Sequence, residues 1–454
     1  MNGYWLVRSL ARLLLSLFYR RVEVVGLDEI PATGPLILAA NHHNSLVDPM
    51  LLVAAVARQL VILATAPLFR HRLIGPFLRL VGALPVHRRQ EAGDDPSRND
   101  TLFDTVNATL AAGRAIVIFP EGRTQPDPVL LPLRTGAVRM LLRAEAAAGP
   151  PVGVKLIPAG LVFHDPGTFR TGWALVLVGK PLSTEDCLAL ARTEPEKAVR
   201  QLTDRLTVAL RQLIVEAEDR QTLRLLHLLE AIWREESRST SDDLAGRADW
   251  MQRVLRAYRY LSSRAPERVE SVRIEVERYA KDVERAGVTG RELSRSYPPS
   301  VVARYAFGEG LSLLVGLPLA LWGMANHIIP YRLTGAVVRW LRRTAEEEAT
   351  DKLAAGMVLY PLSWIVEGCV AWWLTGGWGL ALFTVSLIPT GFFALTWQER
   401  LGRFGREARG FFQFLGNRDL RRRLLARRRA LLDHLAALAQ EVPPSVLKGA
   451  VPET

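Results

Sequence analysis

The N-terminal part of the chain alternates short apolar runs with stretches whose apolar residues recur every three or four positions. The apolar runs have strand length and cover residues 35–40, 60–64, 82–86, 115–119, 154–157 and 173–178. The helical spacing covers residues 48–58, 99–112 and 135–148. Strands that alternate with helices are typical of an α/β domain with a largely parallel sheet. We therefore predict a mostly parallel sheet flanked by helices over residues 22–184.

The first 21 residues carry a separate amphipathic pattern. Its apolar positions follow helical spacing and are Trp5, Leu6, Leu10, Leu13, Leu14, Leu17 and Phe18. Four arginines interrupt or follow them, so the segment lacks the unbroken apolar core of a secretory signal peptide. A basic amphipathic helix is typical of a membrane interface, although a helix packed on its own domain shows the same spacing. We predict a membrane-interface helix over residues 1–21.

The second half of the chain changes character twice. Residues 185–300 have helical spacing with many charges, which predicts a helical linker or cover. Residues 301–397 contain two long apolar segments, 307–329 and 354–397, and the second is divided by Gly376 and Gly377. Each span reaches the roughly 20 residues that a membrane-crossing helix needs. We predict membrane-embedded helices there, with a buried soluble helical bundle as the alternative.

The region that follows the apolar segments is strongly basic. Between residues 398 and 430, eleven arginines stand against three acidic residues, and we treat 398–454 as a basic tail. Such a flank is expected on the cytoplasmic side of a membrane. The loop at 330–353 is also rich in arginine, so it should lie on the cytoplasmic side together with the basic tail. If the α/β domain is cytoplasmic as well, a single crossing by residues 307–329 does not fit. Gly316 and Pro318 in its middle would suit a re-entrant or interfacial segment.

Composition narrows the class of protein. The chain has 454 residues, of which 49% are hydrophobic and 23% charged, which excludes a disordered chain and a transporter built wholly of membrane helices. Its formal net charge of +12 favours anionic partners, either nucleic acid, anionic lipid or a phosphorylated substrate. Because the basic tail directly follows apolar segments, we predict a lipid bilayer and no nucleic acid. Two cysteines, Cys187 and Cys369, allow neither a disulfide framework nor a cysteine-built zinc site.

Polar residues that could perform chemistry follow two of the predicted strands. His43 and Asp48 are spaced so that a loop histidine could take a proton from a hydroxyl while the carboxylate fixes its tautomer. Asp48 followed by proline also fits a plain helix N-cap. His42 has no partner at ligand spacing, so we predict no metal site and interpret His42 as a loop residue. After the strand at 115–119, Glu121-Gly122-Arg123 offers a close backbone approach and a fork that matches phosphate.

Four blocks between about residues 35 and 160 resemble, in their order, the motifs of the membrane glycerolipid acyltransferases. That family includes the lysophosphatidic acid and glycerol-3-phosphate acyltransferases. The blocks are His-x4-Asp at 43–48, Gly-x5-Arg at 82–88, Phe-Pro-Glu-Gly-Arg at 119–123 and an apolar segment around Pro158. Further stretches at 40–51, 66–69, 85–90 and 132–136 look like the branch that uses glycerol-3-phosphate or dihydroxyacetone phosphate. Arg134 stands where that branch usually has lysine, and Arg123-Thr124 where it commonly has Ser-His.

The resemblance implies a role for each matching residue. His43 would be the general base on the acceptor hydroxyl and Asp48 its orienting partner. Arg88 would bind the acceptor phosphate, and the remaining substrate-binding positions would be Glu121, Gly122, Arg123, Arg134 and Pro158.

The resemblance also implies the reaction and its participants. A glycerol-phosphate O-acyltransferase would move a fatty acyl chain from acyl-CoA or acyl carrier protein, used as co-substrate and without a cofactor, to glycerol-3-phosphate. It would act in phospholipid biosynthesis at a membrane, with its catalytic domain facing the cytoplasm. The alternatives are acylation of 1-acyl-glycerol-3-phosphate and, in a different class, an inactive membrane scaffold or transporter.

Overall fold

The computed structural model divides the chain into two compact units. It describes residues 3–70, 74–86, 99–125, 127, 129–147, 151–164, 169–170, 172–236, 243–288, 293, 299–341, 348–416 and 418–448. Unit 1 comprises residues 1–219, 243–249 and 343–353, and unit 2 comprises the rest. Unit 1 therefore includes a short stretch that follows the sheet by well over a hundred residues in the sequence.

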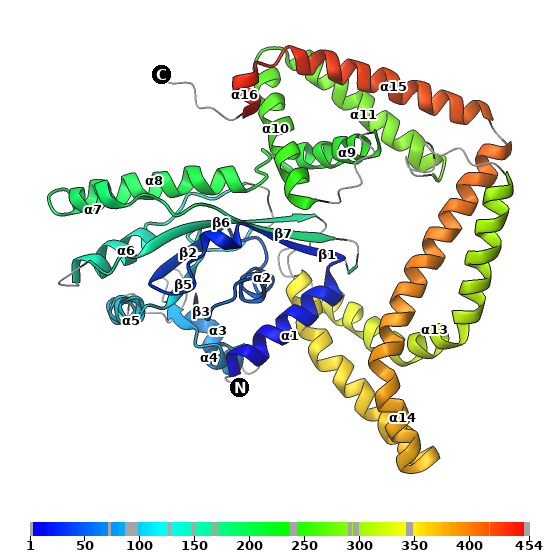
Figure 1. Ribbon diagram of the computed structural model, residues 1–454, viewed down its shortest axis with the longest axis horizontal. Helices are drawn as coiled ribbons and strands as arrows, with labels where there is room; N and C mark the ends of the chain where they lie inside the picture. The colour runs from blue at the N-terminus through cyan, green and yellow to red at the C-terminus, as the bar shows by residue number, and fades with distance from the viewer. Residues whose placement is uncertain are drawn as a thin grey trace. The chain divides into compact units, whose positions relative to one another are not determined.

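Unit 1 is built on a seven-stranded sheet with the order β1-β7-β6-β2-β5-β3-β4 (Figure 1). Its strands are β1 (Arg21–Val25), β2 (Leu36–Ala40), β3 (Leu60–Thr65), β4 (Leu84–Val86), β5 (Ala115–Ile118), β6 (Lys155–His164) and β7 (Trp173–Val178). Neighbouring strands run parallel except β6 and β7, which are antiparallel. The prediction of a mostly parallel α/β sheet is confirmed. β6 is longer than predicted because it pairs with β2 at its start and with β7 at its end.

Helices cover both faces of the sheet. They are α1 (Gly3–Phe18), α2 (Val47–Ala55), α3 (Ala66–Arg70), α4 (Ile74–Leu80), α5 (Asn99–Ala111), α6 (Gly136–Ala147), α7 (Glu185–Ala191) and α8 (Pro195–Leu213). Side chains of β2 alternate between two buried clusters, because successive residues of a strand point to opposite faces. Leu38 joins the cluster that contains α1 and α2, whereas Ile37 joins the cluster that contains α5, α6 and α8. This central strand, buried on both faces, ends at the candidate site.

Helix α1 has two apolar faces, which explains why its sequence fitted two interpretations. One face is buried in unit 1 and consists of Tyr4, Val7, Ala11, Leu15 and Phe18. The other face, which includes Leu6, Leu10 and Leu13, is exposed. The Nε–H groups of Arg8 and Arg12 donate to the carbonyls of Val53 and Ala54 in the last turn of α2. Two of the predicted interface arginines therefore satisfy helix-end carbonyls that otherwise lack partners.

Unit 2 is helical throughout its described residues. Its helices are α9 (Arg220–Glu236), most of α10 (Leu244–Ser262), α11 (Pro266–Arg285), α13 (Pro299–Leu341), α14 (Glu348–Gly416) from Ala354 onward, α15 (Arg418–Gln440) and α16 (Pro444–Lys448). One buried cluster joins α9, α10 and α11 to α15. The basic tail therefore begins within α14 and continues as α15, which packs on the charged helical region.

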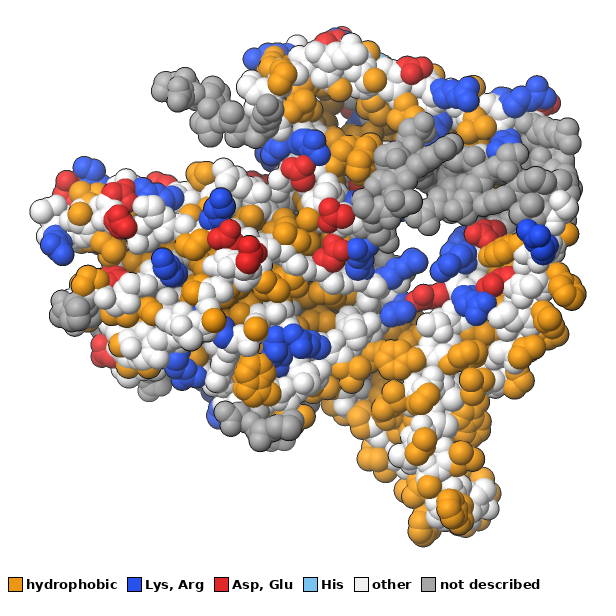
Figure 2. All heavy atoms as spheres, viewed as in Figure 1, with side chains coloured by type: hydrophobic (Ala, Val, Ile, Leu, Met, Phe, Trp, Pro, Cys, Tyr) orange, Lys and Arg blue, Asp and Glu red, His pale blue; other side chains and the backbone are white. Residues whose placement is uncertain are grey.

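Among the residues that the structure describes, two helices of unit 2 are long and apolar enough to cross a membrane. They are α13 and α14, and only 22% and 28% of their most apolar stretches are buried. Hydrophobic side chains cover the exposed surface of these helices in Figure 2. α14 is interrupted at Gly376, whose φ of 70° and ψ of −162° break the helix at the predicted division. α13 is helical through Gly316 and Pro318, so the break expected for a re-entrant segment does not occur at those two residues.

α13 runs against the second arm of α14, which begins after Gly376. Small residues allow close approach: a side chain at Gly323 would meet the carbonyl of Thr390, and one at Gly316 would meet the ring of Phe393. The indole N–H of Trp397 donates to the carbonyl of Leu313 at 2.9 Å. These contacts make the apolar part of α13 and this arm of α14 one packed element.

Candidate functional site

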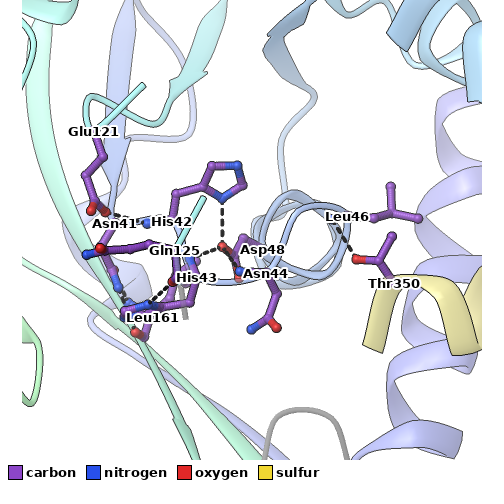
Figure 3. A network of polar contacts seen from close by, with 10 residues as sticks. All are labelled: Asn41, His42, His43, Asn44, Leu46, Asp48, Glu121, Gln125, Leu161 and Thr350. Atoms are coloured by element: carbon purple, nitrogen blue, oxygen red, sulfur yellow. Dashed lines mark hydrogen bonds and ion pairs between the residues drawn. The ribbon is translucent and has the colours of Figure 1, made fainter. Parts of the chain in front are cut away.

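The candidate site begins where β2 ends. Asn41 follows the strand, is fully buried and forms two hydrogen bonds with Leu161 of β6. Its side-chain amide donates to the Leu161 carbonyl at 3.0 Å, and its side-chain oxygen accepts the Leu161 N–H at 2.6 Å. This pairing ties the start of the loop at 41–46 to the neighbouring strand (Figure 3). Loops that follow the carboxyl ends of parallel strands are the usual place for a site in such folds.

Asp48 is completely buried and organises this loop. Its Oδ2 accepts the main-chain N–H groups of His43 and Asn44, at 2.7 and 2.8 Å. The prediction that Asp48 is the N-cap of the next helix is wrong, because α2 begins at Val47 and Asp48 lies in its first turn. The carboxylate reaches backward to the loop from a place where the positive end of the helix favours a negative charge.

The side chain paired with Asp48 is His42. Nδ1 of His42 lies 2.8 Å from Oδ2 of Asp48, and the His42 ring stacks on Phe119 with a centroid distance of 4.1 Å. The expected ring contact with His43 is therefore corrected: Asp48 contacts the main chain of His43 and the ring of His42. Spacing alone could not separate two adjacent histidines.

The ring of His43 has a different partner. Its Nδ1 lies 3.1 Å from the carbonyl oxygen of Gln125. Because a carbonyl only accepts hydrogen bonds, Nδ1 of His43 carries the proton and Nε2 is left with a lone pair. Oδ2 of Asp48, which already accepts two main-chain N–H groups, favours the same tautomer on His42. Both rings are therefore held by Nδ1, which leaves Nε2 of each as a base.

Glu121 connects the loop after β5 to the loop after β2. Its side chain is 3% exposed; Oε1 accepts the N–H of His42 at 2.7 Å and Oε2 accepts the N–H of Leu131 at 3.0 Å. Burial raises the pKa of this carboxyl, while the two N–H donors oppose that shift. The predicted substrate-binding carboxylate thus uses both oxygens on main-chain donors and holds two loops in register.

Two arginines of the second loop present guanidinium groups to solvent. Gly122 has a φ of 73°, and a Cβ there would lie 2.6 Å from Nε of Arg134, so Arg134 lies directly over this glycine. Its main-chain N–H donates to the carbonyl of Pro120 at 2.7 Å, which fixes its place in the loop. Arg123 and Arg134 are exposed, and no ion pair or side-chain hydrogen bond to the described residues occupies either guanidinium. An exposed guanidinium group of this kind suits a contact with a phosphate.

Pro158 and Arg88 are the predicted site residues that remain. Pro158 is buried within β6, where it pairs in register with Ala39 of β2. Arg88 lies outside the described residues. The two cysteines are elsewhere: Cys187 is buried under α8, and Cys369 is exposed on α14. Sequence reasoning missed Asn41, Gln125 and the Asp48 contact of His42, although all three lie within or beside the quoted motifs.

The arrangement combines groups that suit transfer to a hydroxyl. A histidine with a fixed tautomer can accept a proton at neutral pH. A buried carboxylate that holds the loop keeps that histidine in place. The loop that carries Gln125 also carries the exposed guanidinium groups of Arg123 and Arg134, which suit a phosphorylated molecule. The geometry therefore supports general base catalysis on a phosphorylated alcohol.

Comparison with known proteins identifies the part of the chain that contains these loops. A family model described as Acyltransferase matches residues 21–162, which run from β1 to β6. An uncharacterized acyltransferase of Schizosaccharomyces pombe is 26% identical over 308 residues, in an alignment that covers 49% of this chain and 45% of that protein. A 1-acyl-sn-glycerol-3-phosphate acyltransferase of Bacillus subtilis is 30% identical over 202 residues, which is 44% of this chain and 89% of that protein.

A third relative differs in the acceptor that its name gives. Glycerol-3-phosphate O-acyltransferase 1 of Saccharomyces cerevisiae is 30% identical over 135 residues, which is 29% of this chain and 18% of that protein. This chain covers less than half the length of the S. pombe protein and less than a fifth of the length of the S. cerevisiae protein. The residues matched by the family model, 21–162, lie within unit 1.

Proposed function

Because the chain belongs to the glycerolipid acyltransferase family, we propose that it moves a fatty acyl chain from a thioester to the hydroxyl of glycerol-3-phosphate. The donor is acyl-CoA or acyl carrier protein. The observation that carries the proposal is that Asp48 and Gln125 hold the two histidines, and that the loop of Gln125 also carries the exposed guanidinium groups of Arg123 and Arg134. It supplies the base and the phosphate contacts that this reaction needs.

In the proposed mechanism, His43 is the general base. The Gln125 carbonyl keeps its proton on Nδ1, so Nε2 takes the proton of the acceptor hydroxyl. The hydroxyl oxygen then bonds to the thioester carbonyl carbon, and the bond from that carbon to sulfur breaks. The thiolate leaves and takes the proton that His43 received. Asp48 positions the base through its main-chain N–H and not through its ring.

The phosphate of the acceptor is the second part of the proposal. Arg123 and Arg134 bind it, with Arg88 in the same role although it lies outside the described residues. Glu121 and Gly122 keep these loops in place, and Pro158 borders the acyl donor. The second candidate acceptor is 1-acyl-glycerol-3-phosphate, favoured by the B. subtilis relative over 89% of that protein's length. Both acceptors carry the same phosphate, so the guanidinium groups serve either.

Membrane attachment completes the proposal. α13 and α14 enter the bilayer, and the exposed apolar face of α1 lies in its interface. The arginine-rich helix that follows α14 stays on the cytoplasmic side together with unit 1.

Acyl transfer by the purified full-length chain in detergent tests the proposal. The wild type and His43→Ala receive a long-chain acyl-CoA together with glycerol-3-phosphate, dihydroxyacetone phosphate or 1-acyl-glycerol-3-phosphate. A product that depends on His43 is expected with glycerol-3-phosphate. A larger kcat/KM for 1-acyl-glycerol-3-phosphate would select the second acceptor. No transfer to any acceptor, from either acyl-CoA or acyl carrier protein, would favour an inactive scaffold.

A further inference from the structure

The loop at 41–46, the site loop, forms one hydrogen bond with a residue that lies far along the chain. The N–H of Leu46, the residue that precedes α2, donates to Oγ1 of Thr350 at 3.1 Å (Figure 3). Thr350 lies in the first turn of α14 and belongs to unit 1 with the loop. The two residues are 304 positions apart.

The start of α14 is firmly seated in unit 1. Ala349 is 1% exposed and Leu353 is 7% exposed, and both belong to the buried cluster that contains Leu51 of α2. Thr350 is placed between these two buried residues. The seating of this turn brings the Thr350 hydroxyl within hydrogen-bond distance of the loop.

Other main-chain N–H groups of this loop donate to acceptors that differ in origin from Thr350. The N–H of His42 goes to Glu121, and those of His43 and Asn44 go to Asp48. All of these acceptors come from the region that matches the family model. The N–H of Leu46, in contrast, donates to Thr350, which belongs to the helix that also carries the candidate membrane span.

We propose that Thr350 is a positioning residue, through which the first turn of α14 holds the site loop in its reactive shape. This inference rests on the proposed function. Val47 and Asp48 directly follow Leu46, so a shift at the Leu46 N–H moves the carboxylate that fixes His42 and His43. The apolar segment of the same helix begins immediately after Leu353.

Three full-length variants in detergent test the inference. Thr350→Val keeps the side-chain volume but removes the acceptor, and Thr350→Ser keeps the acceptor. Leu353→Val removes one buried methylene from the same helix and leaves the hydrogen bond in place. We expect Thr350→Val to lower kcat roughly tenfold with little change in either KM, because a half-buried N–H loses its partner. Thr350→Ser should restore kcat to within about twofold of the wild type.

Thermal unfolding separates positioning from stability alone. Leu353→Val should lower the unfolding midpoint at least as much as Thr350→Val while it retains kcat. A kcat of wild-type size in Thr350→Val would overturn the inference. So would losses of kcat that follow the unfolding midpoint across all three variants.

Hydrogen exchange provides a readout that does not need activity. Peptides that cover residues 43–50 should exchange faster in Thr350→Val than in the wild type or Thr350→Ser. Equal exchange in all three would overturn the inference even if the wild type is an active acyltransferase. Faster exchange in Thr350→Val, together with a wild type that transfers no acyl chain, would instead reject the proposed function and leave the Thr350 contact supported.

Discussion

Oδ2 of Asp48 lies 2.8 Å from Nδ1 of His42 and accepts the main-chain N–H of the next residue, His43. One carboxylate oxygen therefore acts on two adjacent histidines in two ways. It can stabilise a charged ring on His42, and it fixes the backbone from which the His43 ring projects. The motif spacing assigns the base to His43, while the ring contact makes His42 the competing candidate.

Single alanine variants distinguish the two histidines. We expect His43→Ala to lower kcat by about 100-fold or more, the usual size of a general base effect. His42→Ala should lower kcat by about tenfold, because Asp48 keeps both of its main-chain donors without that ring. The measurement is kcat for acyl transfer in detergent, with circular dichroism as the control for folding. A greater loss in His42→Ala than in His43→Ala would assign the base to His42.

The guanidinium group of Arg134 should govern acceptor affinity. Arg134→Ala is expected to raise KM for the phosphorylated acceptor roughly tenfold or more, because a charge-assisted hydrogen bond is lost. Arg134→Lys should recover part of this affinity, since lysine keeps the charge but not the fork. The matched control is Arg139→Ala, an exposed arginine that pairs with Glu196. Equal changes in KM for Arg134→Ala and Arg139→Ala would remove Arg134 from the phosphate site.

Gly122 tests the same site through the backbone. Its φ of 73° and the 2.6 Å approach of Arg134 leave no room for a Cβ. Gly122→Ala should therefore displace Arg134 and raise KM for the acceptor while the thioester KM changes little. Steady-state kinetics with each substrate varied in turn would measure this. An unchanged acceptor KM would show that the Arg134 side chain can move without loss of binding.

Much of unit 1 could be predicted from the sequence because the information is local. β2 is buried on both faces and therefore has an unbroken apolar run, and the break at Gly376 follows from two adjacent glycines. The site was predictable as a set of loops, since strand ends carry the polar blocks. Its internal contacts were not: whether Asp48 meets His42 or His43 depends on side-chain directions within one turn.

Long-range contacts explain the rest of what the sequence did not reveal. The bond from Leu46 to Thr350 spans 304 positions, and nothing about a threonine before an apolar segment indicates its partner. The role of Glu121 was also hidden, because a carboxylate in a substrate motif gives no sign that both oxygens accept main-chain N–H groups.

The buried carboxyl of Glu121 should make stability depend on pH. Burial raises its pKa, so the folded protein retains a proton at pH values where the unfolded chain has lost it. That contribution to stability is complete below the unfolded pKa and is lost as pH rises through the raised folded pKa. Glu121→Gln mimics the protonated form at every pH. We therefore expect the unfolding midpoint of Glu121→Gln to match the wild type in acid and to exceed it increasingly toward neutral pH.

The difference between the two proteins is the quantity to measure, because all other titrating groups cancel. Unfolding midpoints from pH 4.5 to about 8 would be compared in the same detergent. If the unfolding midpoint of the wild type instead rises relative to that of Glu121→Gln as pH increases, the N–H donors of His42 and Leu131 outweigh the effect of burial on the pKa of Glu121.

The reversal at Gly376 predicts the topology of α14. If both arms cross the bilayer, residues beside Gly376 lie on the face opposite to the arginine-rich end of the second arm. Trp378 and Arg406 are exposed and suit single-cysteine labelling in a Cys369→Ser background, with Cys187 buried. We expect Trp378→Cys to react with an impermeant maleimide added to intact cells, and Arg406→Cys to react only after permeabilisation. Labelling of both positions from the same side would show that α14 lies on the membrane without crossing it.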